Sequence, residues 1–221
     1  MNVLITGTSC GMGEASALKF LNEGHYVFGI DILPVSDRLA NNSKYKHYRA
    51  NVADKSSLPD IEGINVLINN AGVQDSGNDI SINLVGLMNC TEKYALYNPD
   101  IKSVLNQASV SAHNGTEFGE YVASKGGVLS YTKWTAKEIA KYGATCNSLS
   151  FGGVLTELND PVIHNKQLWN AIMSLTPLNK WATAEESADW IYFMTAVNKS
   201  CSGQDIIIDN LETLNGTFVW A

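Results

Sequence analysis

The chain has 221 residues, of which 45% are hydrophobic and 17% are charged, with 22 Asp and Glu against 15 Lys and Arg. The formal net charge of −7 disfavours binding to the phosphate backbone of nucleic acids and to anionic lipid headgroups. No apolar run approaches the roughly 18–20 residues of a membrane-spanning helix, and no Pro/Gly-rich linker divides the chain. We therefore expect one globular domain, residues 1–221, that binds neither nucleic acid nor a membrane.

The first residues lack the basic and apolar segments of a secretory signal. The four cysteines are far apart in the sequence and form no CxxC pair, which argues against a zinc site. We expect reduced, mostly buried thiols, a cytoplasmic location and no metal.

Short β-branched, apolar runs alternate with longer amphipathic stretches along the whole chain. Strands are predicted at residues 2–6, 26–30, 46–50, 65–69, 102–106, 145–150 and 205–208. Helices are predicted at residues 12–23, 79–97, 120–142 and 185–197. This alternation predicts an α/β fold: a doubly wound, Rossmann-type, seven-stranded parallel sheet with helices on both faces.

Two segments deviate from the strand-helix pattern. Residues 32–44 contain Pro34 and a run of polar residues, so we expect only a short helix there. Residues 153–182 hold one helical patch, at 167–175, between two prolines. A connection this long beside a compact sheet is typical of a substrate lid.

A glycine-rich turn follows the first strand, with the spacing Gly7-x3-Gly11-x-Gly13. Glycines let a backbone approach a pyrophosphate closely, and the N-terminus of the next helix supplies free N–H groups. The spacing differs from the G-x-G-x-x-G fingerprint, so a plain tight turn remains an alternative.

Asp31 supports the nucleotide interpretation. It follows the second strand, 20 positions after Gly11, where a carboxylate can accept hydrogen bonds from the adenosine ribose. An Asp there would repel a 2′-phosphate, which favours NAD over NADP, although Arg38 is close in sequence. The alternative is an Asp that only caps a turn.

Tyr121 and Lys125 are four residues apart in a helical pattern and hence lie on one face. A nearby ammonium favours the phenolate, so such a Tyr could exchange a proton with an alcohol oxygen near neutral pH. Ser109 and Ser111, beyond the strand at 102–106, are both candidates to hydrogen-bond the substrate oxygen. Tyr121 and Lys125 could equally lie on a solvated helix face without a catalytic role.

Together these motifs resemble the classical short-chain dehydrogenase/reductase (SDR) family over nearly the whole chain. The matching segments are Thr6-Gly7-x3-Gly11-x-Gly13, Asn69-Asn70-Ala71-Gly72, Ile82-Asn83-Leu84-Val85-Gly86, Asn106-Gln107-Ala108-Ser109, Tyr121-x3-Lys125, Phe151-Gly152-Gly153-Val154-Leu155-Thr156 and Ser202-Gly203-Gln204-Asp205. The resemblance implies hydride transfer between NAD and a substrate carbon, and it selects Ser109 over Ser111.

The resemblance also implies roles for individual residues. Tyr121 is the expected acid/base, Lys125 holds the nicotinamide ribose and lowers the pKa of Tyr121, Ser109 orients the carbonyl or hydroxyl, and Asn83 positions a water. The implied cofactor contacts are Gly7, Ser9, Gly11, Met12, Gly13, Asp31, Ile32, Asn51, Val52, Asn70, Ala71, Gly72, Tyr121, Lys125, Val154 and Thr156.

The chain departs from the family pattern at three places. Asn51 stands where the family usually has Asp, and Phe151 stands where it usually has Pro. The segment between Gly72 and Asn83 is short for the family, so we expect the active-site cleft to be open on that side and the placement of Asn83 to be affected.

The substrate is expected to be a small, largely neutral secondary alcohol or its ketone, because no basic cluster is dedicated to an anion. The candidate substrate contacts are His113, Phe151, Gly152, Trp169 and Met173, with Asn114, Phe118 and Leu168 nearby. Each of His113, Trp169 and Met173 could instead be an ordinary packing residue. The alternatives to a dehydrogenase are a catalytically silent NAD(H)-binding sensor and an isomerase or dehydratase that keeps NAD bound.

The resemblance also implies a homodimer or homotetramer, formed by pairing the helices at 79–97 and 120–142. Tyr131 and Trp134 suit such an interface, or they fill the core. The apolar residues 218–221 suggest packing against the body or against a second subunit.

Overall fold

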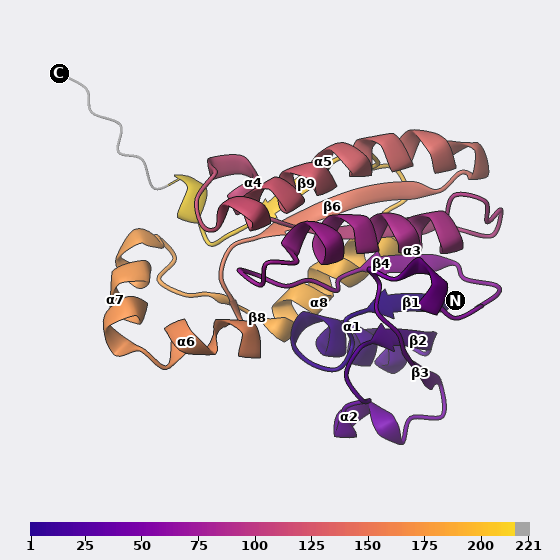
Figure 1. Ribbon diagram of the computed structural model, residues 1–221, viewed down its shortest axis with the longest axis horizontal. Coiled ribbons are helices and arrows are strands. Elements are labelled where there is room, and N and C mark those ends of the chain that lie inside the picture. The colour runs from indigo at the N-terminus through magenta and orange to yellow at the C-terminus, as the bar shows by residue number, and fades with distance from the viewer. Residues whose placement is uncertain (215–221) are drawn as a thin grey trace.

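A computed structural model describes residues 1–214, and it contains the seven-stranded parallel sheet that the sequence predicts (Figure 1). The strands are β1 (Asn2–Thr6), β2 (Tyr26–Asp31), β3 (Tyr45–Arg49), β4 (Val66–Asn69), β5 (Ser103–Ser109), β6 (Thr145–Phe151) and β9 (Asp205–Ile208). Their order across the sheet is β3-β2-β1-β4-β5-β6-β9, which is the doubly wound arrangement.

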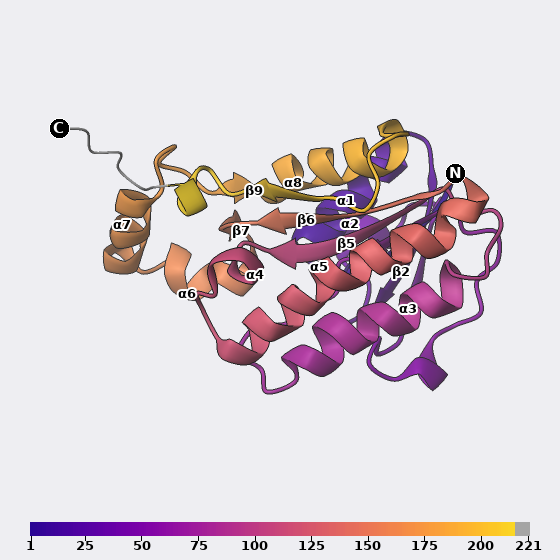
Figure 2. The ribbon, with the colours of Figure 1, turned by 90° about the horizontal axis from the view of Figure 1, so that it is seen from above.

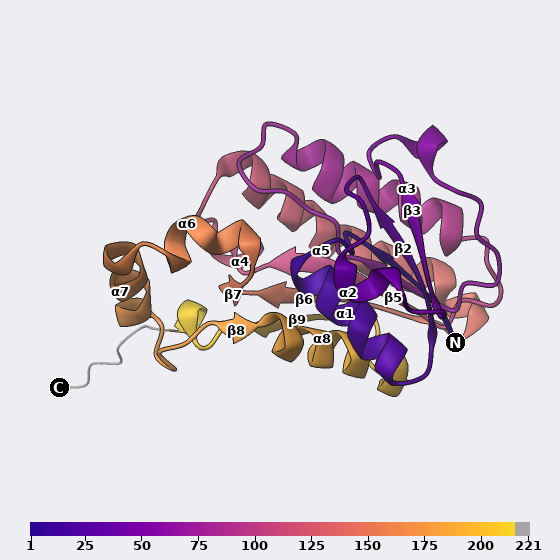
Figure 3. The ribbon, with the colours of Figure 1, turned by 90° about the horizontal axis from the view of Figure 1, so that it is seen from below.

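Helices cover both faces of the sheet (Figures 2 and 3). Helices α1 (Gly11–Asn22) and α8 (Ala184–Tyr192) lie on one face, and α3 (Leu87–Tyr94) and α5 (Gly119–Ile139) lie on the other. The shorter helices are α2 (Asp37–Ala40), α4 (Ser111–Asn114), α6 (Asp160–Ile163) and α7 (Lys166–Leu175). Turns of 3₁₀ helix occupy Lys55–Ser57, Ala140–Tyr142, Glu157–Asn159 and Glu212–Leu214, and π-helical turns occupy Ile80–Gly86 and Phe193–Val197.

The sheet is hydrophobic on both faces because alternate strand residues point to opposite sides. Val3 and Ile5 of β1 pack with Phe20 of α1 in one core cluster. Leu4, between them, packs in the other cluster with Tyr94 of α3 and Ile139 at the end of α5. This double burial explains why the central strands are almost continuously apolar in sequence.

A chain of buried amide side chains connects the centre of the sheet to the helices on one face. The Asn69 amide of β4 donates to Asn106 Oδ1 at 2.9 Å and to Thr91 Oγ1 of α3 at 3.0 Å. The Asn106 amide of β5 donates in turn to Thr132 Oγ1 of α5 at 2.9 Å. These polar groups are fully or almost fully buried, so their mutual hydrogen bonds offset the cost of removing them from water.

Most predicted elements are confirmed, and the differences concern their ends and a few short elements that were not predicted. Strand β5 continues to Ser109, beyond the predicted end at residue 106, because its last residues still pair with β6. The helix predicted at 79–97 begins as a π-helical turn and ends at Tyr94. The two-residue strands β7 (Val154–Leu155) and β8 (Ala182–Thr183) were not predicted, since two residues carry no periodic signal.

Residues 156–181 form a projecting segment that stands away from the sheet and carries α6 and α7 (Figures 1 and 2). The β7–β8 pair closes its base. The helical patch predicted at 167–175 is α7, and Asn165 caps its N-terminus by accepting from the backbone N–H groups of Gln167 and Leu168.

All four cysteines are free thiols. Cys90 and Cys146 are buried, but Cys10 is exposed and Cys201 is half-buried, so the expectation of mostly buried thiols holds for two of them. Within residues 1–214, no helix is both long enough and apolar enough to cross a lipid bilayer. The predicted packing of residues 218–221 lies outside the described residues.

The amide chain generates a stability prediction. Replacing Asn106 with Ala removes the acceptor of one Asn69 hydrogen bond and the donor to Thr132 Oγ1, so we expect the free energy of unfolding to fall by about 1–3 kcal/mol. Urea denaturation at pH 7 measures the change, and Asn170→Ala on the exposed side of α7 is the matched control. A loss no larger than that of the control would show that the chain contributes nothing.

Candidate active site

The carboxyl ends of five adjacent strands open into one cavity of about 750 Å³. Its lining includes Gly7 after β1, Asp31 at the end of β2, Asn70 after β4, Ser109 at the end of β5 and Phe151 at the end of β6. Parallel strands direct all their carboxyl ends to one edge, where doubly wound folds bind their ligands. The cavity continues under the projecting segment, which contributes Ile172, Leu175 and Trp181.

The glycine-rich turn forms one end of the cavity. Gly7 has a φ of 74°, a left-handed conformation that suits glycine. A Cβ on Gly13 would lie 1.8 Å from the Gly7 carbonyl oxygen, so only glycine permits helix α1 to start this close to β1. Cys10, at the N-cap of α1, makes no side-chain cap hydrogen bond, and the first N–H groups of the helix therefore suit an anion.

Asp31 fixes the position of the glycine-rich turn and lines the cavity. Its carboxylate accepts hydrogen bonds from the backbone N–H groups of Ser9 and Leu33, both at 2.9 Å. Arg38, the cation closest in sequence, pairs with Glu14 of α1 at 2.9 Å. Arg49 of β3 donates to the Ile32 carbonyl.

The surface beyond Asp31 suits an adenine ring. Ile32 and Leu33 are 60% and 50% exposed and line the cavity together with Asn51 and Val52. The glycine-rich turn, the free helix N-terminus and the carboxylate at the end of β2 thus form a cleft whose chemistry fits a nicotinamide dinucleotide.

Tyr121, Ser109 and Lys125 meet in the middle of the cavity, as the sequence predicts. The Tyr121 hydroxyl lies beside Ser109, which lowers its pKa, while the Lys125 Nζ lies 5.5 Å from the centroid of the Tyr121 ring. Lys125 is 4% exposed and donates to the Gln107 carbonyl at 2.9 Å. Ser111, the rival candidate, is buried and lies outside the cavity lining, although its N–H donates to Ser109 Oγ at 3.2 Å.

Burial dominates the pKa values of this pair. It raises the pKa of Tyr121 to about 12, against the opposing effect of the Ser109 hydrogen bond, and lowers the pKa of Lys125 to about 8. The expectation that Lys125 lowers the pKa of Tyr121 below its ordinary value is therefore not met in the protein alone. Desolvation is the largest effect on each group, and it favours the neutral form of both.

Asn83 lies behind the cavity wall and does not line it. Its side-chain amide donates to the Val73 carbonyl and to Ser124 Oγ, and its Oδ1 accepts from the Val73 N–H at 2.8 Å. The short segment after Gly72 is thereby attached to α5, one residue before Lys125. Asp79 fixes the same segment by accepting from the N–H groups of Asp75 and Ser76.

Most predicted cofactor contacts line the cavity, and two act indirectly. Gly7, Gly11, Met12, Asp31, Ile32, Asn51, Val52, Asn70, Ala71, Gly72, Tyr121, Lys125, Val154 and Thr156 all face it. Ser9 is outside the lining and donates its N–H to Asp31 instead. Gly13 packs beneath the turn.

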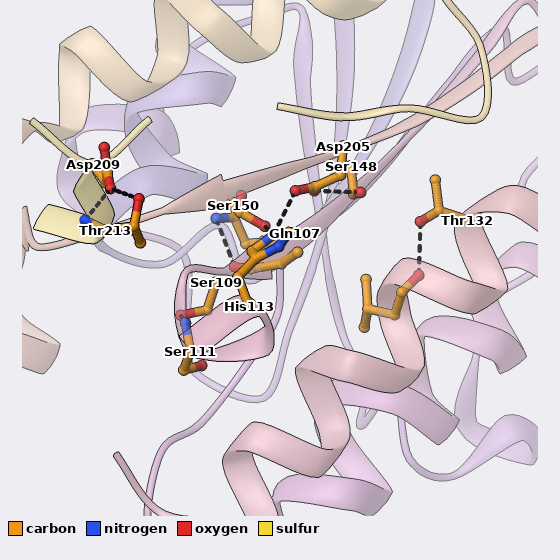
Figure 4. Close-up of polar contacts among 12 residues, drawn as sticks. Gln107, Ser109, Ser111, His113, Thr132, Ser148, Ser150, Asp205, Asp209 and Thr213 are labelled. Carbon is orange, nitrogen blue, oxygen red and sulfur yellow. Dashed lines mark hydrogen bonds and ion pairs between the residues drawn. The ribbon is translucent and has the colours of Figure 1, made fainter. Parts of the chain in front are cut away.

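The structure places three of the predicted substrate contacts elsewhere. His113 of α4 points away from the cavity, with its Nε2 2.8 Å from Asp205 Oδ2 and 3.1 Å from Ser150 Oγ (Figure 4). Asp205 also accepts from Ser148, so a β9 carboxylate that is remote in sequence holds this ring. Trp169 packs edge-on against Trp181 with ring centroids 5.2 Å apart, and Met173 is buried outside the lining.

Phe151 and Gly152 line the cavity as expected, and so does Asn114, whereas Phe118 and Leu168 do not. Sequence reasoning missed Ile172, Trp181, Glu117 and Glu212, which also line it. An amphipathic pattern shows which residues of α7 are apolar, but it does not show which of them faces the substrate. Glu212 follows the last strand, where no sequence signal connects it to the cavity.

Comparisons with known proteins agree with this geometry. A family model described as "Enoyl-(Acyl carrier protein) reductase" matches residues 7–210. The 3-oxoacyl-[acyl-carrier-protein] reductase FabG of Thermotoga maritima is 29% identical over 93% of this chain and 95% of its own length. Glucose 1-dehydrogenase of Gluconobacter oxydans is 29% identical over 98% of this chain and 93% of its own length. A solved structure of 4-hydroxyisoleucine dehydrogenase complexed with NADH superposes with a TM-score of 0.88 at 26% identity, covering 96% of this chain and 98% of that one.

The family model spans the glycine-rich turn, the Ser109–Tyr121–Lys125 group and the last strand, and the relatives align over almost their full lengths. The chain belongs to the short-chain dehydrogenase/reductase family, whose members named here are oxidoreductases.

Proposed function

We propose that this protein is an NAD-dependent oxidoreductase that interconverts a secondary alcohol and a ketone, with Tyr121 as the proton donor and acceptor. The observation that carries the proposal is that Ser109, Tyr121 and the buried Lys125 line one cavity, with the Lys125 ammonium 5.5 Å from the centroid of the Tyr121 ring. A complete set of three such groups favours chemistry over a binding-only role. Relatives named as reductases and as dehydrogenases support both directions of the reaction.

In the reduction, the hydroxyls of Ser109 and Tyr121 both hydrogen-bond the carbonyl oxygen and orient it. Tyr121 is protonated at neutral pH, since burial raises its pKa to about 12, so it donates its proton to the oxygen as charge develops there. The Lys125 ammonium lies over the ring and stabilises the phenolate that remains. A bound nicotinamide dinucleotide supplies the hydride in this direction and accepts it in the other.

Asn83 is a positioning residue in this scheme. It holds the Val73 backbone on one side and Ser124 on the other, so it aligns the cavity wall with the helix that carries Tyr121 and Lys125.

The preference for NAD rests on Asp31. Its carboxylate lies at the end of β2, where it would accept from ribose hydroxyls and repel a 2′-phosphate. Arg38, which could otherwise attract that phosphate, is engaged by Glu14. The similar 4-hydroxyisoleucine dehydrogenase was solved with NADH.

We also propose that the protein is a homodimer or homotetramer that pairs α3 and α5 with a second copy. Met88 of α3 and Trp134 of α5 are 39% and 44% exposed, and Tyr131 stacks near Trp134 with ring centroids 5.2 Å apart. Exposed apolar side chains on adjacent long helices suit such an interface.

Replacing Tyr121 with Phe removes the proton donor but keeps the ring. We expect kcat/KM for carbonyl reduction to fall at least about 100-fold, while the NADH dissociation constant changes less than about threefold. NADH absorbance measures turnover and NADH fluorescence measures binding. Tyr142→Phe, outside the cavity, is the matched control. A Tyr121→Phe variant with parental turnover would refute the mechanism.

Replacing Asp31 with Asn removes the charge and keeps the shape. We expect the ratio of kcat/KM for NAD to that for NADP to fall at least about tenfold, because the 2′-phosphate no longer meets a carboxylate. Asp37→Asn, an exposed carboxylate on α2, removes the same charge nearby. An equal effect in both variants would mean that Asp31 does not select the cofactor.

Burial of Lys125 predicts a pH-dependent stability. Its pKa is about 8 in the folded protein against an ordinary value of 10.5, so the unfolded chain binds more protons between these pH values. Stability linked to this group therefore rises with pH through that window, and the cost of burying the ammonium is full below pH 8. Lys125→Met should thus raise the free energy of unfolding more at pH 7 than at pH 10, by about 3 kcal/mol.

Urea denaturation of the parent and of Lys125→Met at both pH values measures this difference. Lys133→Met, on the exposed side of the same helix, is the control and should show equal changes at pH 7 and pH 10. A pH-independent effect of Lys125→Met would contradict the assigned cause.

A further inference from the structure

Two carboxylates from remote parts of the chain face the same cavity as Tyr121. Glu117 lies in the loop before α5, and Glu212 begins the 3₁₀ turn after β9. The proposed mechanism uses neither of them. Ser109, Tyr121 and Lys125 line this cavity too. The two carboxylates can therefore contact the part of a substrate that lies next to the reacting oxygen.

A strained turn holds Glu212 in place. Asn210 and Leu211, immediately before it, both have left-handed backbone conformations, with φ values of 53° and 72°. Such a conformation is unfavourable for a branched residue like Leu211 and persists only where surrounding contacts enforce it. Asp209 supplies those contacts, since its carboxylate accepts from the N–H groups of Leu211 and Thr213 and from the Thr213 hydroxyl (Figure 4).

The Glu212 carboxylate contacts the base of the projecting segment. Oε1 accepts from Trp181 Nε1 at 2.8 Å and from Thr176 Oγ1 at 3.4 Å, and Oε2 accepts from the Gly153 N–H at 3.3 Å. A carboxylate has roughly four acceptor sites, so these three donors leave capacity on the side that faces the cavity. The protein donors also keep the carboxylate oriented before any ligand enters.

Glu117, which is remote from Glu212 in the sequence, also lines the cavity. Its backbone is left-handed as well, with a φ of 81°. Gln74 donates to its Oε2 at 3.2 Å. Glu117 is exposed overall, but desolvation of its carboxylate and the charge of Glu212 raise its pKa, so the two carboxylates repel each other. Burial also raises the pKa of Glu212.

The charge of the lining is strongly unbalanced. Asp31, Glu117, Glu157 and Glu212 face the cavity, and among the described lining residues the one basic side chain is Lys125. Lys125 already donates to Gln107 and is committed to the reacting end. An anionic substrate would therefore be repelled, while a neutral substrate would leave the repulsion between Glu117 and Glu212 in place.

We propose that the substrate carries a protonated primary amine, bound by Glu117 and Glu212 while its alcohol or ketone oxygen contacts Ser109 and Tyr121. An ammonium donates up to three hydrogen bonds and neutralises the repulsion between the carboxylates. The substrate class is thus an amino alcohol or the corresponding amino ketone. This inference rests on the proposed function because it places the substrate beside Tyr121.

Three small alcohols of similar size test the charge directly: 1-amino-2-propanol, neutral 2-butanol and anionic 3-hydroxybutyrate. Calorimetric titration into the full-length protein saturated with NADH, at pH 7.5, gives a dissociation constant for each without requiring turnover. We expect 1-amino-2-propanol to bind at least about tenfold more tightly than 2-butanol, and 3-hydroxybutyrate to bind more weakly than 2-butanol.

Glu212→Gln and Glu117→Gln should each reduce the preference for the amine over 2-butanol to within about threefold. Glu120→Gln, which removes the same charge three residues from Glu117 and outside the cavity lining, should keep the preference. Because Glu212 also contacts Trp181, Glu117→Gln is the variant that reports on charge without touching the projecting segment.

Equal or tighter binding of 2-butanol or 3-hydroxybutyrate, or a preference that survives both Gln variants, would overturn the inference. Parallel assays measure the oxidation of each alcohol by NAD, so that the test of the ammonium site is separate from the test of the proposed reaction. Oxidation of 2-butanol without any preference for the amine would refute the ammonium site and leave the proposed reaction standing. A charge-dependent preference for the amine with no oxidation of any alcohol would support the site and refute the reaction.

Discussion

The architecture of the site depends on the point where the sheet changes its winding direction. The chain passes from β1 outwards to β2 and β3 and then returns to pair β4 on the other side of β1. The loops after β1 and β4 therefore diverge and leave a crevice between them at the carboxyl edge. The missing Cβ of Gly13 lets α1 start against the Gly7 carbonyl, which aims the helix N-terminus into that crevice.

Burial competes with charge at the centre of the site. Tyr121 and Lys125 lie one helical turn apart, and spacing alone suggests an ammonium that draws the phenol towards its ionised form. In the folded protein, desolvation favours the neutral form of both, so the phenol stays protonated far above neutral pH. A protonated phenol next to Ser109 is suited to proton donation, and the ammonium acts on the phenolate left after transfer.

Positioning residues connect this centre to the rest of the fold. Asn83 ties the short segment after Gly72 to α5. Asp79 closes a turn within that segment by accepting from the Asp75 N–H. The shorter connection, noted in the sequence as a departure from the family, is thus a well-fixed wall of the cavity. At the opposite end, Glu212 joins the turn after β9 to the base of the projecting segment.

The sequence by itself determined the doubly wound, seven-stranded α/β sheet, the cofactor turn and the Ser109–Tyr121–Lys125 group. These features depend on local periodicity and on motifs that are short and contiguous, so they are readable without three-dimensional contacts. Only the tertiary structure shows the contacts between residues that are remote in sequence. His113 contacts Asp205, and Glu117 and Glu212 line one cavity. The structure also shows that Ile172, and not Trp169, lines the cavity. Such contacts depend on how the loops after different strands converge. They could not be predicted from the sequence because the residues around each member of a pair form no local pattern that identifies the other member.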